Sequence, residues 1–166
     1  IVTKIDDGTH TASVVDAISG NDSFEDLDLA DFSKALGALP RYALGGAAWY
    51  ISPAGYHASI ERLQMAGAGS SADIAAGGLP RFLGLPVVQT LVMDSTLGTD
   101  AGVVKVLVGD AALAGIYGIR DQVNIRSTVD EYARYDQTAW YAQIRVDYNW
   151  HSLGDTIEAG PMVALK

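Results

Sequence analysis

The first third of the chain carries apolar residues at helical spacing. They recur every three to five positions, at Phe24, Leu27, Phe32, Leu36 and Leu39. A period near 3.6 places such residues on one face, so the spacing predicts an amphipathic helix that Pro40 ends. Acidic residues crowd its front, at Asp22, Glu25, Asp26, Asp28 and Asp31. They suit the positive end of a helix dipole; a carboxylate cluster that binds a divalent cation is the alternative interpretation.

A short strand and a second helix follow. The run Ala47–Ile51 is apolar and aromatic, as is typical of a strand. Ser52 then offers an N-cap oxygen and Pro53 fits the first helical position. The pattern predicts a helix to about Met65, with Tyr56 and Ile60 on its apolar face.

From residue 82 onward the pattern is mostly that of strands. Residues 82–88 are apolar, and Pro86, which has no N–H to donate, is typical of an edge strand. Further strand-like segments are 103–108, 116–125, 132–135, 139–148 and 162–165. In the segment 139–148, Ala142, Ile144, Val146 and Tyr148 alternate with Gln143, Arg145 and Asp147. This strand therefore has one apolar and one polar face.

The order of elements predicts the fold class. Helix, strand, helix, loop and then several strands indicate an α+β fold, with helices packed on a mainly antiparallel sheet and long strands near the C-terminus. We divide the chain into an irregular entry segment (1–22), an α+β domain (23–130) and closing strands (131–166). The closing strands either extend beyond that domain or return to its sheet.

The amino-acid composition argues against several classes of function. The formal net charge is −9, from 11 basic and 20 acidic residues, which argues against binding nucleic-acid phosphates or an anionic membrane. The sequence has no Cys, so no disulfide framework or thiolate metal site is expected, and a reducing cytoplasm fits. No apolar run approaches the roughly 20 residues of a membrane span. Ile1 is neither an initiator Met nor the start of a signal peptide, so we expect the chain to begin inside a longer gene product.

No catalytic or metal motif emerges. His10, His57 and His151 lack the spacing of a zinc site, and no Gly-x-Ser-x-Gly elbow occurs. His57 lies one helical turn from Glu61, an ordinary pair for a helix surface.

Within the Gly/Ser-rich stretch 66–80, Gly67 and Gly69 loosely resemble a nucleotide fingerprint, but they follow a helix where a strand is required. The stretch is typical of a surface loop, and we predict no catalytic residue, cofactor or metal. Aromatic residues at the strands, Trp49, Tyr50, Trp140, Tyr141, Tyr148 and Trp150, suit either interfaces or a core.

Several ordered runs resemble the major capsid proteins of tailed bacteriophages. The run Phe32–Leu36, Leu39–Tyr42 and Ala48–Ala54 is similar to that family's helix, aromatic strand and second helix. Arg81–Val88, followed by Met93, resembles a leucine-Gly-x-Pro-Val segment, and Leu107–Asp110 resembles a strand that ends in Gly-Asp. The strands around Arg134–Asp147 also resemble the family's closing strands. The resemblance covers roughly residues 24–166 in the family's order.

The resemblance implies an axial domain over 23–130 and part of a peripheral domain in the closing strands. It implies a non-enzymatic subunit that forms pentamers and hexamers with copies of itself. Such subunits build the virion shell of a phage or prophage in the host cytoplasm, enclosing DNA without sequence-specific binding. Axial loops meet at symmetry axes in that family, so we name Gly67, Gly69, Ser70, Ser71 and Asp73 as candidate subunit-contact residues.

Three family elements, the N-terminal arm, the extended hairpin loop and the long spine helix, have no match in this sequence. Because subunit contacts depend heavily on the arm and the hairpin loop, we expect this chain alone to be monomeric or weakly associating. Two alternative functions stay open. One is an encapsulin-type cargo shell, which shares the fold. The other is a small-ligand-binding or hydrolytic α+β domain with residues 66–80 as a lid.

Overall fold

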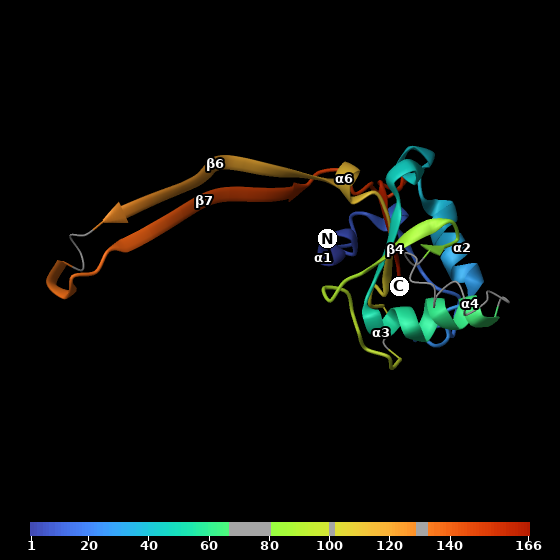
Figure 1. Cartoon of the computed structure of the whole chain (residues 1–166). Coiled ribbons are helices and arrows are strands. Elements are labelled where there is room, and N and C mark those ends of the chain that lie inside the picture. Colours follow the sequence, from blue (N-terminus) through green and yellow to red (C-terminus); the bar gives the residue numbers. More distant parts are fainter. Residues whose placement is uncertain (67–80, 100–101, 129–132) are drawn as a thin grey trace. The chain divides into compact units, whose positions relative to one another are not determined.

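The computed structural model describes residues 1–66, 81–99, 102–128 and 133–166. The chain divides into two compact units (Figure 1). The first contains residues 1–114 and 152–166, and the second contains residues 115–151. None of the helices in the described ranges has the length and apolar character that a membrane span requires.

A six-stranded sheet forms the centre of the first unit, in the order β1-β8-β5-β2-β4-β3. Its strands are β1 (Val14–Val15), β2 (Ala48–Ile51), β3 (Arg81–Phe82), β4 (Leu85–Gln89), β5 (Val106–Gly109) and β8 (Met162–Leu165). The pairs β1–β8 and β2–β4 are parallel, and the other three pairs are antiparallel. The sheet is therefore mixed with an antiparallel majority. Since β3 covers its outer side, β4, which holds Pro86, is the second strand from the edge.

The first predicted helix is shorter than its apolar pattern. Helix α2 (Leu29–Ala38) ends just before Leu39 and Pro40, as predicted. Phe24 and Leu27 are fully buried but precede it. The Asp31 carboxylate accepts the backbone N–H of Asp28 at 3.0 Å, and this contact fixes the start of the helix.

The second predicted helix is confirmed. It runs through α3 (Pro53–Gly55), a π-helical turn η3 (Tyr56–Glu61) and α4 (Arg62–Ala66). Ser52 Oγ accepts the N–H of Gly55 at 3.2 Å, and Pro53 follows it in the first turn. Tyr56 and Ile60 are buried on the face predicted from the spacing.

Aromatic side chains form the centre of the core. Trp49 is fully buried on β2 and contacts Phe32 and Phe82 edge to face, at ring-centroid distances of 5.5 and 6.0 Å. Its indole N–H donates to the carbonyl oxygen of Phe82 at 3.0 Å. One side chain thus connects α2, β2 and β3, which places the core between the helices and the sheet.

The predicted irregular entry segment is an ordered part of the first unit. It contains α1 (Val2–Ile5), a 3₁₀ turn η1 (Thr11–Ser13) and β1. Buried Ser13 Oγ donates to Leu153 O at 2.6 Å and accepts the N–H of Gly160 at 2.8 Å. Lys166 Nζ lies 3.0 Å from Asp6 Oδ1. These contacts join the two ends of the described chain, a pairing too distant in sequence for periodicity to reveal.

The turn that meets Ser13 contains a carboxylate with a lowered pKa. Asp155 accepts the backbone N–H groups of Glu158 at 2.7 Å and Ile157 at 2.6 Å. These two hydrogen bonds hold the pKa of Asp155 below its ordinary value, and the bond from Glu158 has the larger effect. A pKa lower in the folded than in the unfolded state contributes stability above the unfolded-state pKa, and this is lost as the pH falls through the folded value. We expect a carboxyl NMR titration to find the Asp155 midpoint below that in an unstructured peptide of the same local sequence. An equal midpoint would contradict this.

The second unit is a long β-hairpin of β6 (Gly115–Thr128) and β7 (Ala139–Trp150), drawn in orange tones in Figure 1. The predicted boundary at 130/131 falls between its strands, so the observed division differs from the predicted one. The reason is that β6 pairs with β7, whereas β8 returns to the central sheet. Residues 133–135, expected to be extended, form a 3₁₀ turn η4 (Ala133–Tyr135). Two other short helical segments are η2 (Arg41–Gly46) and α6 (Ala111–Ala114), both in the first unit.

Candidate assembly surface

The β6–β7 hairpin has two chemically distinct faces. Residues directly opposite each other in an antiparallel pair share a face, and successive residues alternate between faces. The register pairs Tyr117 with Tyr148, Ile119 with Val146, Ile125 with Ala142 and Ser127 with Trp140. With Ile144, which alternation places on the same side, these residues form one face that carries no charged group. We call it the apolar hairpin face.

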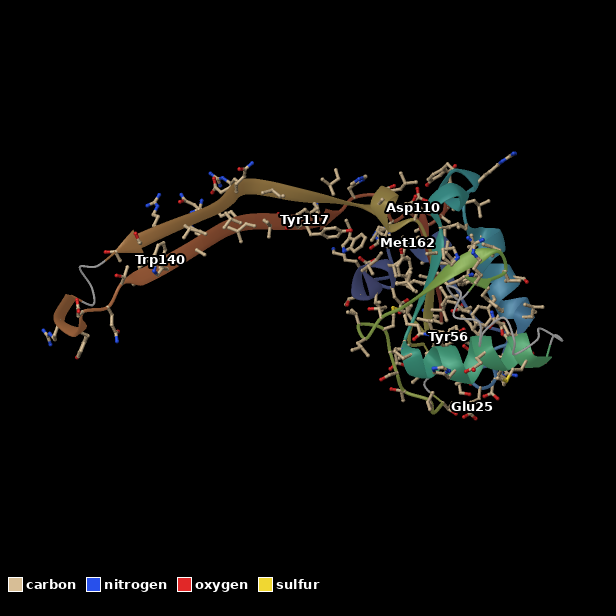
Figure 2. The ribbon with its side chains drawn as sticks, in the orientation of Figure 1. Glu25, Tyr56, Asp110, Tyr117, Trp140 and Met162 are labelled. Atoms are coloured by element: carbon tan, nitrogen blue, oxygen red, sulfur yellow. The ribbon has the colours of Figure 1, made fainter. Side chains whose placement is uncertain are left out.

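The apolar hairpin face is exposed. Trp140 is 71% exposed, Ile125 62% and Ile144 52%. Figure 2 shows Tyr117 and Trp140 far apart along the hairpin, on β6 and β7. A monomeric soluble protein rarely exposes an apolar patch larger than about 300–600 Å². A row of Trp, Tyr and Ile side chains along two strands this long is therefore a candidate interaction surface.

The opposite face carries the charged residues of the strand pair, together with the exposed side chains of Ile116 and Tyr141. Asn124 pairs with Gln143, Asp121 with Arg145 and Gly118 with Asp147. Arg145 Nε lies 3.7 Å from Asp121 Oδ2, and both side chains are more than half exposed. Because solvent screens such a pair, its effect on stability is small. Because it carries the charged groups, this face is the more hydrophilic of the two, and we call it the polar face.

A glycine permits the aromatic contact at the base of the hairpin. Tyr148 and Trp150 meet edge to face with ring centroids 4.5 Å apart. Opposite Trp150 lies Gly115, where a Cβ atom would collide with the Tyr148 hydroxyl. A side chain at position 115 would therefore displace the Tyr148 ring.

An isolated two-stranded hairpin is marginally stable in water, and independent stability requires further strands or a helix on its apolar face. In the described part of the chain, β6 and β7 pair only with each other. The hairpin thus has both an apolar face and a free strand edge available for assembly.

The residues singled out in the sequence divide between different environments. The candidate contact residues Gly67, Gly69, Ser70, Ser71 and Asp73 lie outside the described residues, and their role stays a prediction. Of the aromatic residues, Trp49 belongs to the core and Trp140 to the surface. Both occur in strand-like runs, and only the alternation around Trp140 signals a half-exposed strand. The sequence predicted the two faces of β7. It did not predict that β6 pairs with β7 and contributes the other residues of each face.

The described ranges contain no group of three or more His, Cys, Asp or Glu side chains placed to hold a metal ion. Fully buried Asp31 contacts the backbone N–H of Ile18 and the amide of Asn21, and its role is structural. His57 Nδ1 contacts Glu61 Oε2 on an exposed helix surface, as expected from their spacing. His10 Nδ1 lies 2.7 Å from the carbonyl oxygen of Gly154.

Comparison with known proteins identifies the family of this chain. A family model described as the phage capsid family matches residues 3–150. The chain therefore belongs to the phage capsid family. No curated protein sequence matches it.

Two solved structures are similar in fold. They are the capsid of an empty GTA particle and the capsid of a native GTA particle, each computed with C5 symmetry. Their TM-scores are 0.56 and 0.58, and both are 18% identical to this chain over 92% of its length. The matches cover 49% and 48% of those chains, so this chain spans about half of their length. The predicted α+β capsid fold is confirmed.

Proposed function

We propose that this chain is part of a structural, non-enzymatic subunit of a phage or prophage shell, which assembles from copies of itself into pentamers and hexamers. The observation that carries the proposal is the exposed apolar hairpin face, because large exposed apolar surfaces commonly contact another polypeptide. Membership of the phage capsid family and the fold shared with GTA particle capsids support it.

The apolar hairpin face has a natural occupant under this proposal. About half the length of the two GTA capsid chains has no counterpart here. A segment from that half, packed along β6 and β7, would remove the exposed Ile, Tyr and Trp side chains from water. Burial of apolar area at roughly 25 cal/mol per Å² would then stabilise both the hairpin and the subunit.

The shell forms in the host cytoplasm and encloses DNA without sequence-specific contacts. The net charge of −9 supports this role, because a strongly basic lining would hold the genome by phosphate contacts. Expression of the complete gene product alone, followed by negative-stain microscopy, tests the proposal. Closed shells or rings of subunits support it, and small monodisperse particles at every salt and protein concentration would overturn it. Protein cargo in place of DNA inside the shells would identify a cargo shell.

Two substitutions on neighbouring residues of β7 test the role of the hairpin in that assembly. Ile144→Glu places a carboxylate on the apolar hairpin face, where burial of a charge is unfavourable. Gln143→Glu introduces the same side chain on the polar face. We expect Ile144→Glu to abolish shells and Gln143→Glu to retain them in the same microscopy. Equal shell yields from both variants would exclude the apolar hairpin face as an assembly surface.

A further inference from the structure

The outer edge of β7 adjoins no further strand in the described part of the chain. Among the described residues, β7 pairs with β6 along one edge and with no strand along the other. The register shifts at Ile119/Asp121 and Asp121/Asn124 each add a residue to β6, so the bulges lie on β6 and β7 is regular. β7 also contains no Pro, Gly or Lys. Natural edge strands use Pro, bulges and charged side chains to prevent pairing with another chain. On β7 the only such features are the charges of Arg145 and Asp147.

The sequence of β7 is complementary to itself about Val146. When two identical strands pair antiparallel around a two-fold axis, the central residue faces its own copy and the flanking residues face each other. Centred on Val146, the pairing places Arg145 opposite Asp147 of the second copy, and the reverse contact repeats it. Opposite charges across a strand pair are favourable, whereas like charges are unfavourable.

The next positions outward are also complementary. Ile144 faces Tyr148 of the second copy on the apolar side, and Gln143 faces Asn149 on the polar side. A shift of the centre to Arg145 would place two guanidinium groups opposite each other, and a centre at Asp147 would do the same with two carboxylates. A centre at Ile144 would leave Arg145 facing Gln143. Charge complementarity therefore selects Val146 over these three neighbouring registers.

The groups that this pairing uses are exposed. Val146 is 45% exposed and Ile144 52%. The Arg145 side chain is 55% exposed although it lies near Asp121, and Asp147 Oδ1 accepts only the adjacent Tyr148 N–H at 2.8 Å among the described hydrogen bonds. Pairing would join two hairpins into a four-stranded sheet, which exceeds the three strands that a sheet with one apolar face needs for independent stability. The apolar hairpin faces of both copies would then form one continuous surface.

We infer that the outer edge of β7 is a two-fold contact between copies of this chain, with the strands antiparallel and Val146 at the centre. Such a contact is isologous, so the same surface serves both partners. It goes beyond the shell proposal, because it specifies one edge and one register. It is testable in the 166-residue chain, whereas shell formation is tested in the complete gene product. Either can fail without the other.

Single cysteines test the register. The sequence has no native Cys, so each variant carries one thiol. In Val146→Cys the two Cα atoms would lie about 4.5–5.5 Å apart, within the range of roughly 4.4–6.8 Å that a disulfide spans. Ile144→Cys is the control, because its two copies would be offset by four residues, about 13 Å. We expect mild oxidation to give a covalent dimer from Val146→Cys and at least tenfold less from Ile144→Cys. Equal cross-linking, or none at high protein concentration, would overturn the register.

Charge reversal tests the contact independently. We expect sedimentation equilibrium to show at least tenfold weaker dimerisation for Arg145→Asp and for Asp147→Arg. The double variant exchanges the two charges and should restore dimerisation. Since it does not restore the contact of Arg145 with Asp121, recovery would report on the contact between copies. Arg126→Asp, on the polar face of β6, is the control and should dimerise like the unaltered chain. A double variant as weak as the single ones would overturn the proposal.

Discussion

Replacing Trp49 by Ala is expected to lower the free energy of unfolding of the first unit by about 4 kcal/mol, within the usual range for a buried Trp. Trp49 is fully buried, and its ring contacts both Phe32 and Phe82. Its removal leaves a cavity among three aromatic positions. It also removes the hydrogen bond from the indole N–H to the Phe82 carbonyl oxygen, 3.0 Å away, which adds to the loss.

Urea unfolding followed by far-ultraviolet circular dichroism measures this effect. Trp140→Ala is the matched control, since it removes the same side chain from a position that is 71% exposed. A surface substitution of that kind changes the free energy of unfolding by about 0.5 kcal/mol or less. Similar losses in the two variants would contradict the assignment of Trp49 to the core and Trp140 to the assembly surface.

The sequence predicted the elements whose signals are local. Ser52 and Pro53 start the second helix as expected, and Pro40 marks the end of α2. The alternation along β7 identified its two faces, because side chains in a strand change sides at every residue. These features depend on neighbours within a few positions, where spacing and capping chemistry act directly.

The features that the sequence did not predict depend on distant contacts. Nothing local indicates that β1 pairs in parallel with β8, or that Ser13 accepts a hydrogen bond from Gly160. Phe24 and Leu27 have helical spacing, yet Phe24 is buried in a turn and Leu27 just after it, because the helix starts only at Leu29, where Asp31 fixes its first turn. The strand β7 and its two faces were predicted, but periodicity cannot select β6 as its partner. The contact residues named from the sequence lie in 67–73, outside the described residues, and stay a prediction.

Asp31 is the second residue whose substitution should have a large effect. Its side chain is fully buried. Oδ1 accepts the N–H of Ile18 at 2.8 Å, and Oδ2 accepts the amide of Asn21 at 2.6 Å and the N–H of Asp28 at 3.0 Å. The hydrogen bonds of one carboxylate thus connect the segment before α2 to the start of that helix. Hydrogen bonds to a charged acceptor are roughly twice as strong as neutral ones.

Asp31→Asn keeps the shape of the side chain and removes the charge, so no cavity complicates the result. The new amide NH₂ must face at least one of these three donors, which leaves a buried donor unsatisfied. We expect the free energy of unfolding to fall by about 3 kcal/mol, from weakened hydrogen bonds and desolvation. The control is Glu25→Gln, an exposed acidic residue of the same segment (Figure 2), with an expected change of about 0.5 kcal/mol or less. A loss below about 1 kcal/mol for Asp31→Asn would mean that Ile18, Asn21 and Asp28 find other acceptors. A large loss would establish that this carboxylate, which the sequence places among the acidic residues at the positive end of the helix dipole, stabilises the start of α2 from a buried position.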